Sequence, residues 1–222
     1  MLYPVLVHYP VVDREGREIT AAVTNLDIHD LARMAVTYTT GAVWIVTPLA
    51  AQRQLVGEII RHWTVGRGGR VNPDRRAALM KIRVAADLEE VAAVLEREEN
   101  RPVYQVATSA AAGETVTSYR RLRRLLAGGP GSYLLLFGTA WGLSRRLLAA
   151  ADYRLPPIRP AAVYNHLPVR AAAAIVLDRL LAPAERGWLP TGRPDYELQA
   201  NEEEHSYSIV EGEQENESDP TD

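Results

Sequence analysis

Residues 133–137 have the sequence Tyr-Leu-Leu-Leu-Phe, and the turn Gly-Thr-Ala-Trp-Gly follows at positions 138–142. The apolar run has the length of a strand that is buried on both faces of a sheet. Residues 143–151, which come next, predict a short helix. A strand, a turn and a helix in this order form the repeating unit of α/β proteins with a parallel sheet.

Similar units occur along most of the chain. We expect strands at 2–8, 42–47, 81–85, 103–107 and 153–155, and helices at 27–38, 48–65, 87–98, 118–126 and 167–181. Pro48 suits a first helical turn, Asp87 with Glu90 has the spacing of a capping box, and the Gly- and Arg-rich stretch 67–73 predicts a loop. The pattern predicts an α/β fold with a parallel sheet of five or six strands and helices on both faces.

Composition excludes several kinds of site and protein. The 222 residues include no cysteine, which excludes disulfide frameworks, thiolate catalysis and cysteine-ligated metals and fits a reducing cytoplasm. No stretch approaches the roughly 20 apolar residues that span a membrane. The first eight residues predict a strand and not a signal peptide. We therefore predict a cytoplasmic protein that does not enter a membrane and holds no metal.

Charge is distributed unevenly along the chain. Residues 1–195 hold all 25 basic residues, which are arginines apart from Lys81, against 18 of the 28 acidic ones, so this part carries a net charge of +7. The other 10 acidic residues lie in 196–222, which has no Lys or Arg. A basic body suits a polyanion such as RNA, and a solvated arginine-rich surface explains the charge equally well. We predict a domain over 1–182, a linker over 183–195 and an acidic disordered tail over 196–222.

Three loops follow predicted strands in the second half of the chain, and ligands of parallel sheets bind at such loops. They are the small-residue stretch 107–113, the glycine turn 138–142 and the proline-rich segment 155–170. Backbone N–H groups in the second loop favour a carboxylate or phosphate, although the spacing matches neither a dinucleotide fingerprint nor a P-loop. Ordinary turns explain the first two loops equally well, and Asn165 in the third has an alternative role as a helix N-cap. A phosphate-binding α/β enzyme is therefore one alternative.

Several stretches together carry a resemblance to a known class. They are G-T-A-W-G-L at 138–143, a Pro-Ile turn at 157–158, Y-N-H-L-P-V-R-A-A-A-A-I at 164–175, L-Y-P-V-L-V-H-Y-P-V at 2–11, T-N-L-D-I-H-D-L-A-R at 24–33 and R-H-W-T-V-G at 61–66. The chain resembles RNA methyltransferases of the SPOUT, or alpha/beta-knot, class, and within it a small bacterial family of predicted RNA methyltransferases. The resemblance covers roughly residues 1–182.

The resemblance implies a deep C-terminal trefoil knot, a homodimer, and S-adenosylmethionine held mainly by main-chain groups of the three loops. It also implies methyl transfer to a ribose 2′-hydroxyl or a base of tRNA or rRNA. By position, it assigns cofactor contacts to Thr108, Ser109, Gly138, Thr139, Gly142, Ile158, Asn165, Leu167 and Val169.

Candidate catalytic residues lie in the first part of the chain. Asn25 and Arg33 resemble the Asn…Arg motif that supplies an active-site arginine in the ribose-methylating branch. Arg33 would lower the pKa of the acceptor or hold a phosphate, and an equal alternative is a surface ion pair with Asp27 or Asp30. His8, at the carboxyl end of the first predicted strand, is a third candidate.

Other features leave the acceptor open. His62 and Trp63 with nearby arginines offer stacking and charge for RNA, or simply end a helix. Many ribose methylases of this class carry a Glu between the glycines of the second loop, where this chain has Thr-Ala-Trp at 139–141, and they often have Ser-Leu-Asn where it has Asn-His-Leu at 165–167. The alternative hypothesis is a non-catalytic S-adenosylmethionine-binding regulatory or RNA-binding protein.

Overall fold

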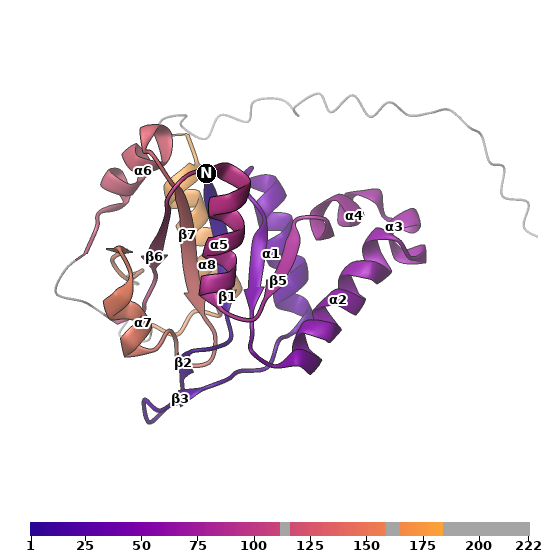
Figure 1. Cartoon of the computed structure of the whole chain (residues 1–222), viewed down its shortest axis with the longest axis horizontal. Coiled ribbons are helices and arrows are strands. Elements are labelled where there is room, and N and C mark those ends of the chain that lie inside the picture. Colours follow the sequence, from indigo (N-terminus) through magenta and orange to yellow (C-terminus); the bar gives the residue numbers. More distant parts are fainter. Residues whose placement is uncertain (112–115, 159–164, 184–222) are drawn as a thin grey trace, which may run out of the picture. The chain divides into compact units, whose positions relative to one another are not determined.

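A computed structural model describes residues 1–111, 116–158 and 165–183, and this part of the chain contains a sheet of six strands (Figure 1). Their order across the sheet is β5 (Ile82–Ala85), β4 (Val43–Val46), β1 (Leu2–Val7), β7 (Ser132–Gly138), β6 (Val103–Ala107) and β8 (Tyr153–Arg154). Every pairing between neighbours is parallel. The prediction of an α/β fold with five or six parallel strands is confirmed.

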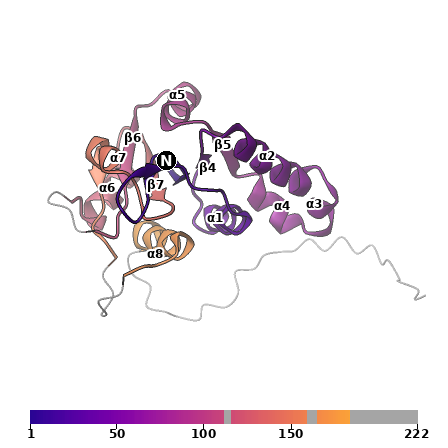
Figure 2. The same ribbon diagram turned by 90° about the horizontal axis from the view of Figure 1, so that it is seen from below.

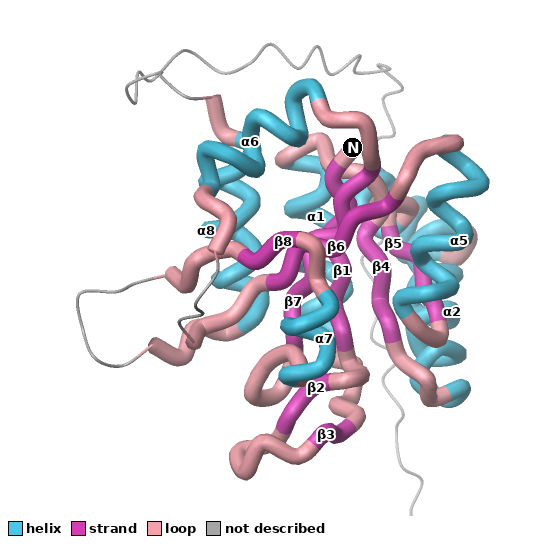
Figure 3. Tube along the Cα trace, turned by 60° about the vertical axis from the view of Figure 1, so that its left-hand side comes forward, coloured by secondary structure: helices cyan, strands magenta, loops and turns pink. Residues whose placement is uncertain are grey.

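Helices cover both faces of the sheet (Figure 2). The helices on one face are α1 (Asn25–Thr37), α2 (Ala50–Thr64), α4 (Pro73–Leu79), α6 (Tyr119–Gly128) and α8 (Val169–Leu181), and those on the other are α5 (Leu88–Glu99) and α7 (Arg145–Ala150). The short helix α3 (Arg67–Val71) joins α2 to α4. An antiparallel hairpin of β2 (Val11–Val12) and β3 (Glu18–Ile19) lies outside the sheet, beyond the carboxyl end of β1 (Figure 3).

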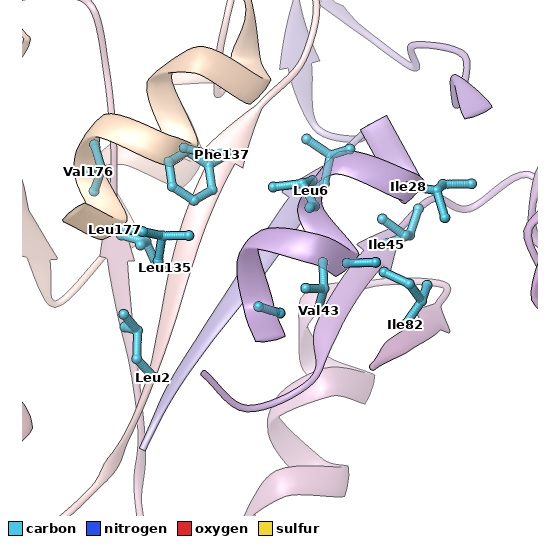
Figure 4. Packing of buried hydrophobic residues seen from close by; sticks show 14 of the residues in the cluster. Leu2, Leu6, Ile28, Val43, Ile45, Ile82, Leu135, Phe137, Val176 and Leu177 are labelled. Atoms are coloured by element: carbon cyan, nitrogen blue, oxygen red, sulfur yellow. The ribbon is translucent and has the colours of Figure 1, made fainter. Parts of the chain in front are cut away.

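Successive side chains of the central strands enter opposite cores, because a strand alternates its two faces. In β7, Leu135 and Phe137 share a core with Val176 of α8 (Figure 4), whereas Leu134 and Leu136 belong to the core beneath α5 and α7. Burial on both faces explains why the strand is apolar throughout and lacks a polar alternation.

A side-chain cap begins α5, as the sequence predicts. The Asp87 carboxylate accepts a hydrogen bond from the Glu90 backbone N–H at 2.8 Å, and the Glu90 carboxylate accepts one from the Ala86 N–H at 2.7 Å. The two acidic side chains therefore satisfy free N–H groups at the start of α5. Pro48 lies just before α2, whose N-cap is Leu49, and so is not in the helix.

The prediction of a loop over residues 67–73 was wrong. Residues 67–71 form α3, and α4 begins at Pro73. The side chain of Asn72 caps α4 by accepting from the Arg75 N–H at 2.9 Å, and Pro73 takes the first helical turn. A capping residue followed by proline is a strong helix start, and here it outweighs the preceding glycines.

The arrangement brings the carboxyl ends of β1, β6, β7 and β8 to one edge of the sheet, because these strands are mutually parallel neighbours. The loops that follow them therefore meet there. Residues 159–164, on the path of the predicted knot, lie outside the described residues, as do 184–222, which include most of the predicted linker and all of the predicted tail. The knot and these boundaries stay predictions.

Candidate active site

A cavity of about 1160 Å³ lies at this edge of the sheet. Its walls come from the loops after β6, β7 and β8, from the first turn of α8 and from the residues that lead into α1. All nine residues to which the sequence assigned cofactor contacts line it: Thr108, Ser109, Gly138, Thr139, Gly142, Ile158, Asn165, Leu167 and Val169. Three loops far apart in sequence thus enclose one space.

The loop after β7 turns sharply through two unusual backbone conformations. Gly142 has a φ of 109°, a value that favours glycine. Ala140 has a φ of 50°, and residues with a side chain rarely adopt a positive φ. At Gly138 an added Cβ would lie 2.4 Å from the backbone N of Leu143, so the turn closes only with glycine there. Nothing lies within 4 Å of a Cβ built at Gly142, although its N–H donates to the Thr139 carbonyl at 2.9 Å and its carbonyl accepts from the Val12 N–H at 3.0 Å.

The third loop is fastened to the first by one side chain. The Asn165 amide donates to the Ile158 carbonyl at 3.0 Å and to the Ala110 carbonyl at 3.5 Å. The alternative role of Asn165 as an N-cap was wrong, because the N-cap of α8 is Pro168. Asn165 instead holds two walls of the cavity together.

The first loop and the apolar wall complete the cavity. The Thr108 hydroxyl donates to the Leu136 carbonyl at 2.8 Å, and the Ser109 hydroxyl accepts from the Ala111 N–H at 3.1 Å. Both side chains therefore bind backbone and shape the loop. Leu155 and Val176 contribute apolar surface to the same cavity.

A charged cluster that the sequence analysis missed joins α8 to α1 beside the cavity. The Arg170 guanidinium lies 3.1 Å from Asp27 Oδ1 and 2.8 Å from Asp30 Oδ2. Asp27 also accepts from the Thr24 hydroxyl at 2.6 Å. The alternative in which Arg33 pairs with one of these aspartates is therefore wrong, because their partner is Arg170, some 140 residues away in sequence.

Arg33 and Asn25 lie together in a second cavity, of about 440 Å³, between α1, α2 and α4. His29, His62, Trp63 and Arg75 also line it. The rings of both histidines meet the Trp63 ring edge-on, with centroids 5.3 and 5.2 Å away, and the Arg75 guanidinium covers it at 5.1 Å. The predicted Asn…Arg pair and the predicted stacking residues are thus one cluster, and it does not line the first cavity.

His8 occupies neither cavity. Its side chain is 0% exposed, and its ring nitrogens form no well-aligned hydrogen bond to a described residue. Burial lowers the pKa of the imidazole to about 4, although the Asp27 charge and backbone groups of Ala21 and Ala22 partly oppose this. His8 is therefore neutral at pH 7.

The described residues contain no cluster of three or more His, Asp or Glu side chains suited to a metal ion. None of the described helices is both long enough and apolar enough to cross a membrane.

Comparison with known proteins decides the family. A family model described as SAM-dependent RNA methyltransferase matches residues 1–182. The chain belongs to this family. The resemblance predicted from the sequence motifs is therefore confirmed, and S-adenosylmethionine is the cofactor of these methyltransferases.

Relatives of this family member cover most of the chain. A tRNA (guanine-N(1)-)-methyltransferase of Oleidesulfovibrio alaskensis is 45% identical over 82% of this chain, but the chain spans only 42% of that protein's length. An uncharacterized protein of Aquifex aeolicus is 37% identical over 80% of this chain and 86% of its own length. A solved structure of a probable methylase family protein from Haemophilus influenzae Rd KW20 shares the fold, with a TM-score of 0.53 at 17% identity over 86% of this chain and 72% of its own.

The cavity suits S-adenosylmethionine, the cofactor of the family. Its volume of about 1160 Å³ exceeds the roughly 300–1,000 Å³ of typical small-molecule sites. The lack of a side chain at Gly142 lets a ligand approach the turn closely, and Leu155, Ile158 and Val176 supply an apolar wall for a flat ring.

Proposed function

We propose that the protein transfers a methyl group from S-adenosylmethionine to a nucleotide of tRNA or rRNA, in the cytoplasm. The observation that carries the proposal is the single cavity in which the three loops meet at the carboxyl edge of the sheet. The family and the basic residues 1–195 support an RNA acceptor. The name of the Oleidesulfovibrio relative supports tRNA.

The nine loop residues would bind and orient the cofactor, whose sulfonium methyl group is open to direct displacement by an oxygen or nitrogen of the acceptor. Backbone groups near Gly138 and Gly142 would bind its polar end, and the apolar wall would bind its adenine. A fixed orientation matters because aligned reactants account for much of the rate of such transfers.

Asn25 and Arg33 would act on the acceptor from a second subunit. Both line the smaller cavity of their own chain and not the cofactor cavity, which supports a homodimer in which each site borrows them from its partner. A C-terminal knot, as in the class that the chain resembles, would hold the cofactor loops in place. For His8, burial points to a supporting role beneath α1.

The acceptor atom is either a ribose 2′-hydroxyl or a base nitrogen, and each must lose a proton during transfer. Arg33 would favour the deprotonated acceptor or hold the neighbouring phosphate. Asp27 is the carboxylate among the described residues of the cofactor cavity, but Arg170 and Thr24 already occupy its oxygens. We therefore assign Asp27 a positioning role.

Incubation with radiolabelled S-adenosylmethionine and total tRNA or rRNA from a strain lacking the gene tests the proposal. Label should enter RNA, and nucleoside mass spectrometry should identify the product. A ribose methyl group would block alkaline cleavage at its nucleotide, and a base methyl group would not. Arg33→Ala should slow transfer by about 100-fold or more with unchanged affinity for S-adenosylhomocysteine, whereas Arg97→Ala, on the exposed surface of α5, should have no effect.

A non-catalytic cofactor-binding protein is the second candidate, favoured by the lack of a carboxylate at positions 139–141. The same experiment separates the two. Normal binding of S-adenosylhomocysteine without label transfer to either RNA would favour this candidate over the methyltransferase.

A further inference from the structure

Trp141 is exposed at the mouth of the cofactor cavity. Its side chain is 62% exposed, although it lines the cavity, whereas Trp44 is 4% exposed and Trp63 is half-buried. Such exposure is unusual for tryptophan, which is highly buried on average and is enriched at surfaces that bind a partner. The left-handed conformation of Ala140 directly precedes it.

The β2–β3 hairpin holds this residue in place. The Trp141 N–H donates to the Val12 carbonyl at 3.1 Å, and the Val12 N–H donates to the Gly142 carbonyl at 3.0 Å. These bonds pair the loop with the hairpin that lies beyond the end of the sheet (Figure 3). The backbone of residues 141 and 142 is therefore held in place by two hydrogen bonds to Val12.

The hairpin also brings a cation to the cavity. Arg14 is exposed, lines the same cavity as Trp141, and has no ion pair with a described residue. Its neighbour Arg17 differs, because it pairs with Asp13 at 2.7 Å and with Glu15 at 3.1 Å. An unpaired guanidinium and an exposed indole that line one cavity offer both contacts that a nucleotide needs, a stacking face and a phosphate partner.

We propose that Trp141 and Arg14 form a nucleotide clamp, in which the indole stacks on an unpaired base of the RNA acceptor and the guanidinium binds an adjacent phosphate. The clamp rests on the proposed function, since it places the acceptor next to the cofactor loops. It assigns a role to the residue that stands between the two glycines of the second loop. RNA is favoured over a protein partner because the surface combines one aromatic face with an unneutralised positive charge.

Fluorescence anisotropy with labelled, unfractionated tRNA and saturating S-adenosylhomocysteine tests the clamp without requiring methyl transfer. Trp141→Ala should weaken RNA binding by about 5- to 150-fold, and Trp141→Phe should retain affinity within about 3-fold, because any aromatic ring can stack on a base. Arg14→Ala should reduce the slope of log K against log salt by about 0.7–0.9, the effect of one lost phosphate contact. Arg17→Ala is the matched control and should leave that slope unchanged.

Four results would overturn the clamp: unaltered RNA affinity in Trp141→Ala, an equal loss of S-adenosylhomocysteine affinity, a halved mass of this variant in light scattering, or no binding of tRNA or rRNA by the unmodified protein. The second would make Trp141 a cofactor contact, and the third a subunit contact. If the variants bind RNA as expected but the unmodified protein transfers no methyl group, the proposed function fails and the clamp stands.

Discussion

Acidification from pH 7 to pH 5 should destabilise the protein through the buried His8. The imidazole is fully enclosed, and burial lowers its pKa from 6.5 to about 4. Between these two values the unfolded chain binds a proton that the folded chain does not, so folding stability falls as the pH decreases. The contribution of His8 is complete above pH 6.5 and is lost as the pH falls towards 4.

The magnitude follows from the two pKa values. A histidine with a pKa of 6.5 when unfolded and about 4 when folded contributes a loss of about 2 kcal/mol between pH 7 and pH 5, and of about 3 kcal/mol down to pH 4. Such a loss is a large part of the roughly 5–15 kcal/mol that stabilises an ordinary domain.

Urea unfolding followed by circular dichroism at pH 7 and pH 5 measures the effect, with His8→Leu as the comparison. The leucine variant removes the titrating group and fills the site with an apolar side chain, so its free energy of unfolding should depend less on pH by about 2 kcal/mol. His29, whose pKa is also lowered by burial, titrates in both proteins and cancels in the comparison. Equal losses in the two proteins would show that His8 does not cause the acid sensitivity. His8→Gln serves the same purpose if the leucine variant does not fold.

Three substitutions test the cavity and its supports. Gly138→Ala should lower the affinity for S-adenosylhomocysteine by about 10-fold or more in calorimetry, because a methyl group there meets the Leu143 backbone and the turn must shift. The control Gly128→Ala has open space around its Cβ and should leave this affinity unchanged. Asn165→Ala removes one bond to the first loop and one within the third loop, and should weaken the same affinity by about 5- to 10-fold. Equal binding would mean that the cavity needs neither bond. Arg170→Met should lower the free energy of unfolding in urea by about 1–2 kcal/mol, because it leaves two partly buried aspartates unpaired, and an unchanged midpoint would refute a stabilising role for this ion pair.

Local chemistry made much of the fold predictable. Apolar runs such as the one in β7 predict strands that are buried on both faces, and Asp87 marks the start of α5. The start of α4 was also present in the sequence as Asn72 followed by Pro73, but the glycines before it obscured the signal. The β2–β3 hairpin was not predicted, because strands of two residues are too short to show the alternation of apolar and polar residues.

The place where the cavity loops meet was predictable, because it follows from the strand ends. The contacts between segments far apart in the sequence were not predictable. The three loops follow strands, so their meeting at one edge is a consequence of a parallel sheet. The ion pairs of Arg170 with α1 and the pairing of Trp141 with the hairpin join segments more than 100 residues apart. No periodicity encodes such contacts, and the order of the strands is likewise set only by packing of the whole chain.

The central position of β1 also sets the order of events during synthesis. One side of β1 pairs with β4, about 40 residues later in the chain, whereas the other side pairs with β7, with Leu2 opposite Tyr133. At the roughly 5–20 residues per second of translation, that second side waits on the order of 10 seconds for its partner. Until β7 has emerged, this edge of β1 lacks its partner strand, and an unpaired apolar strand edge is a place where other chains can pair.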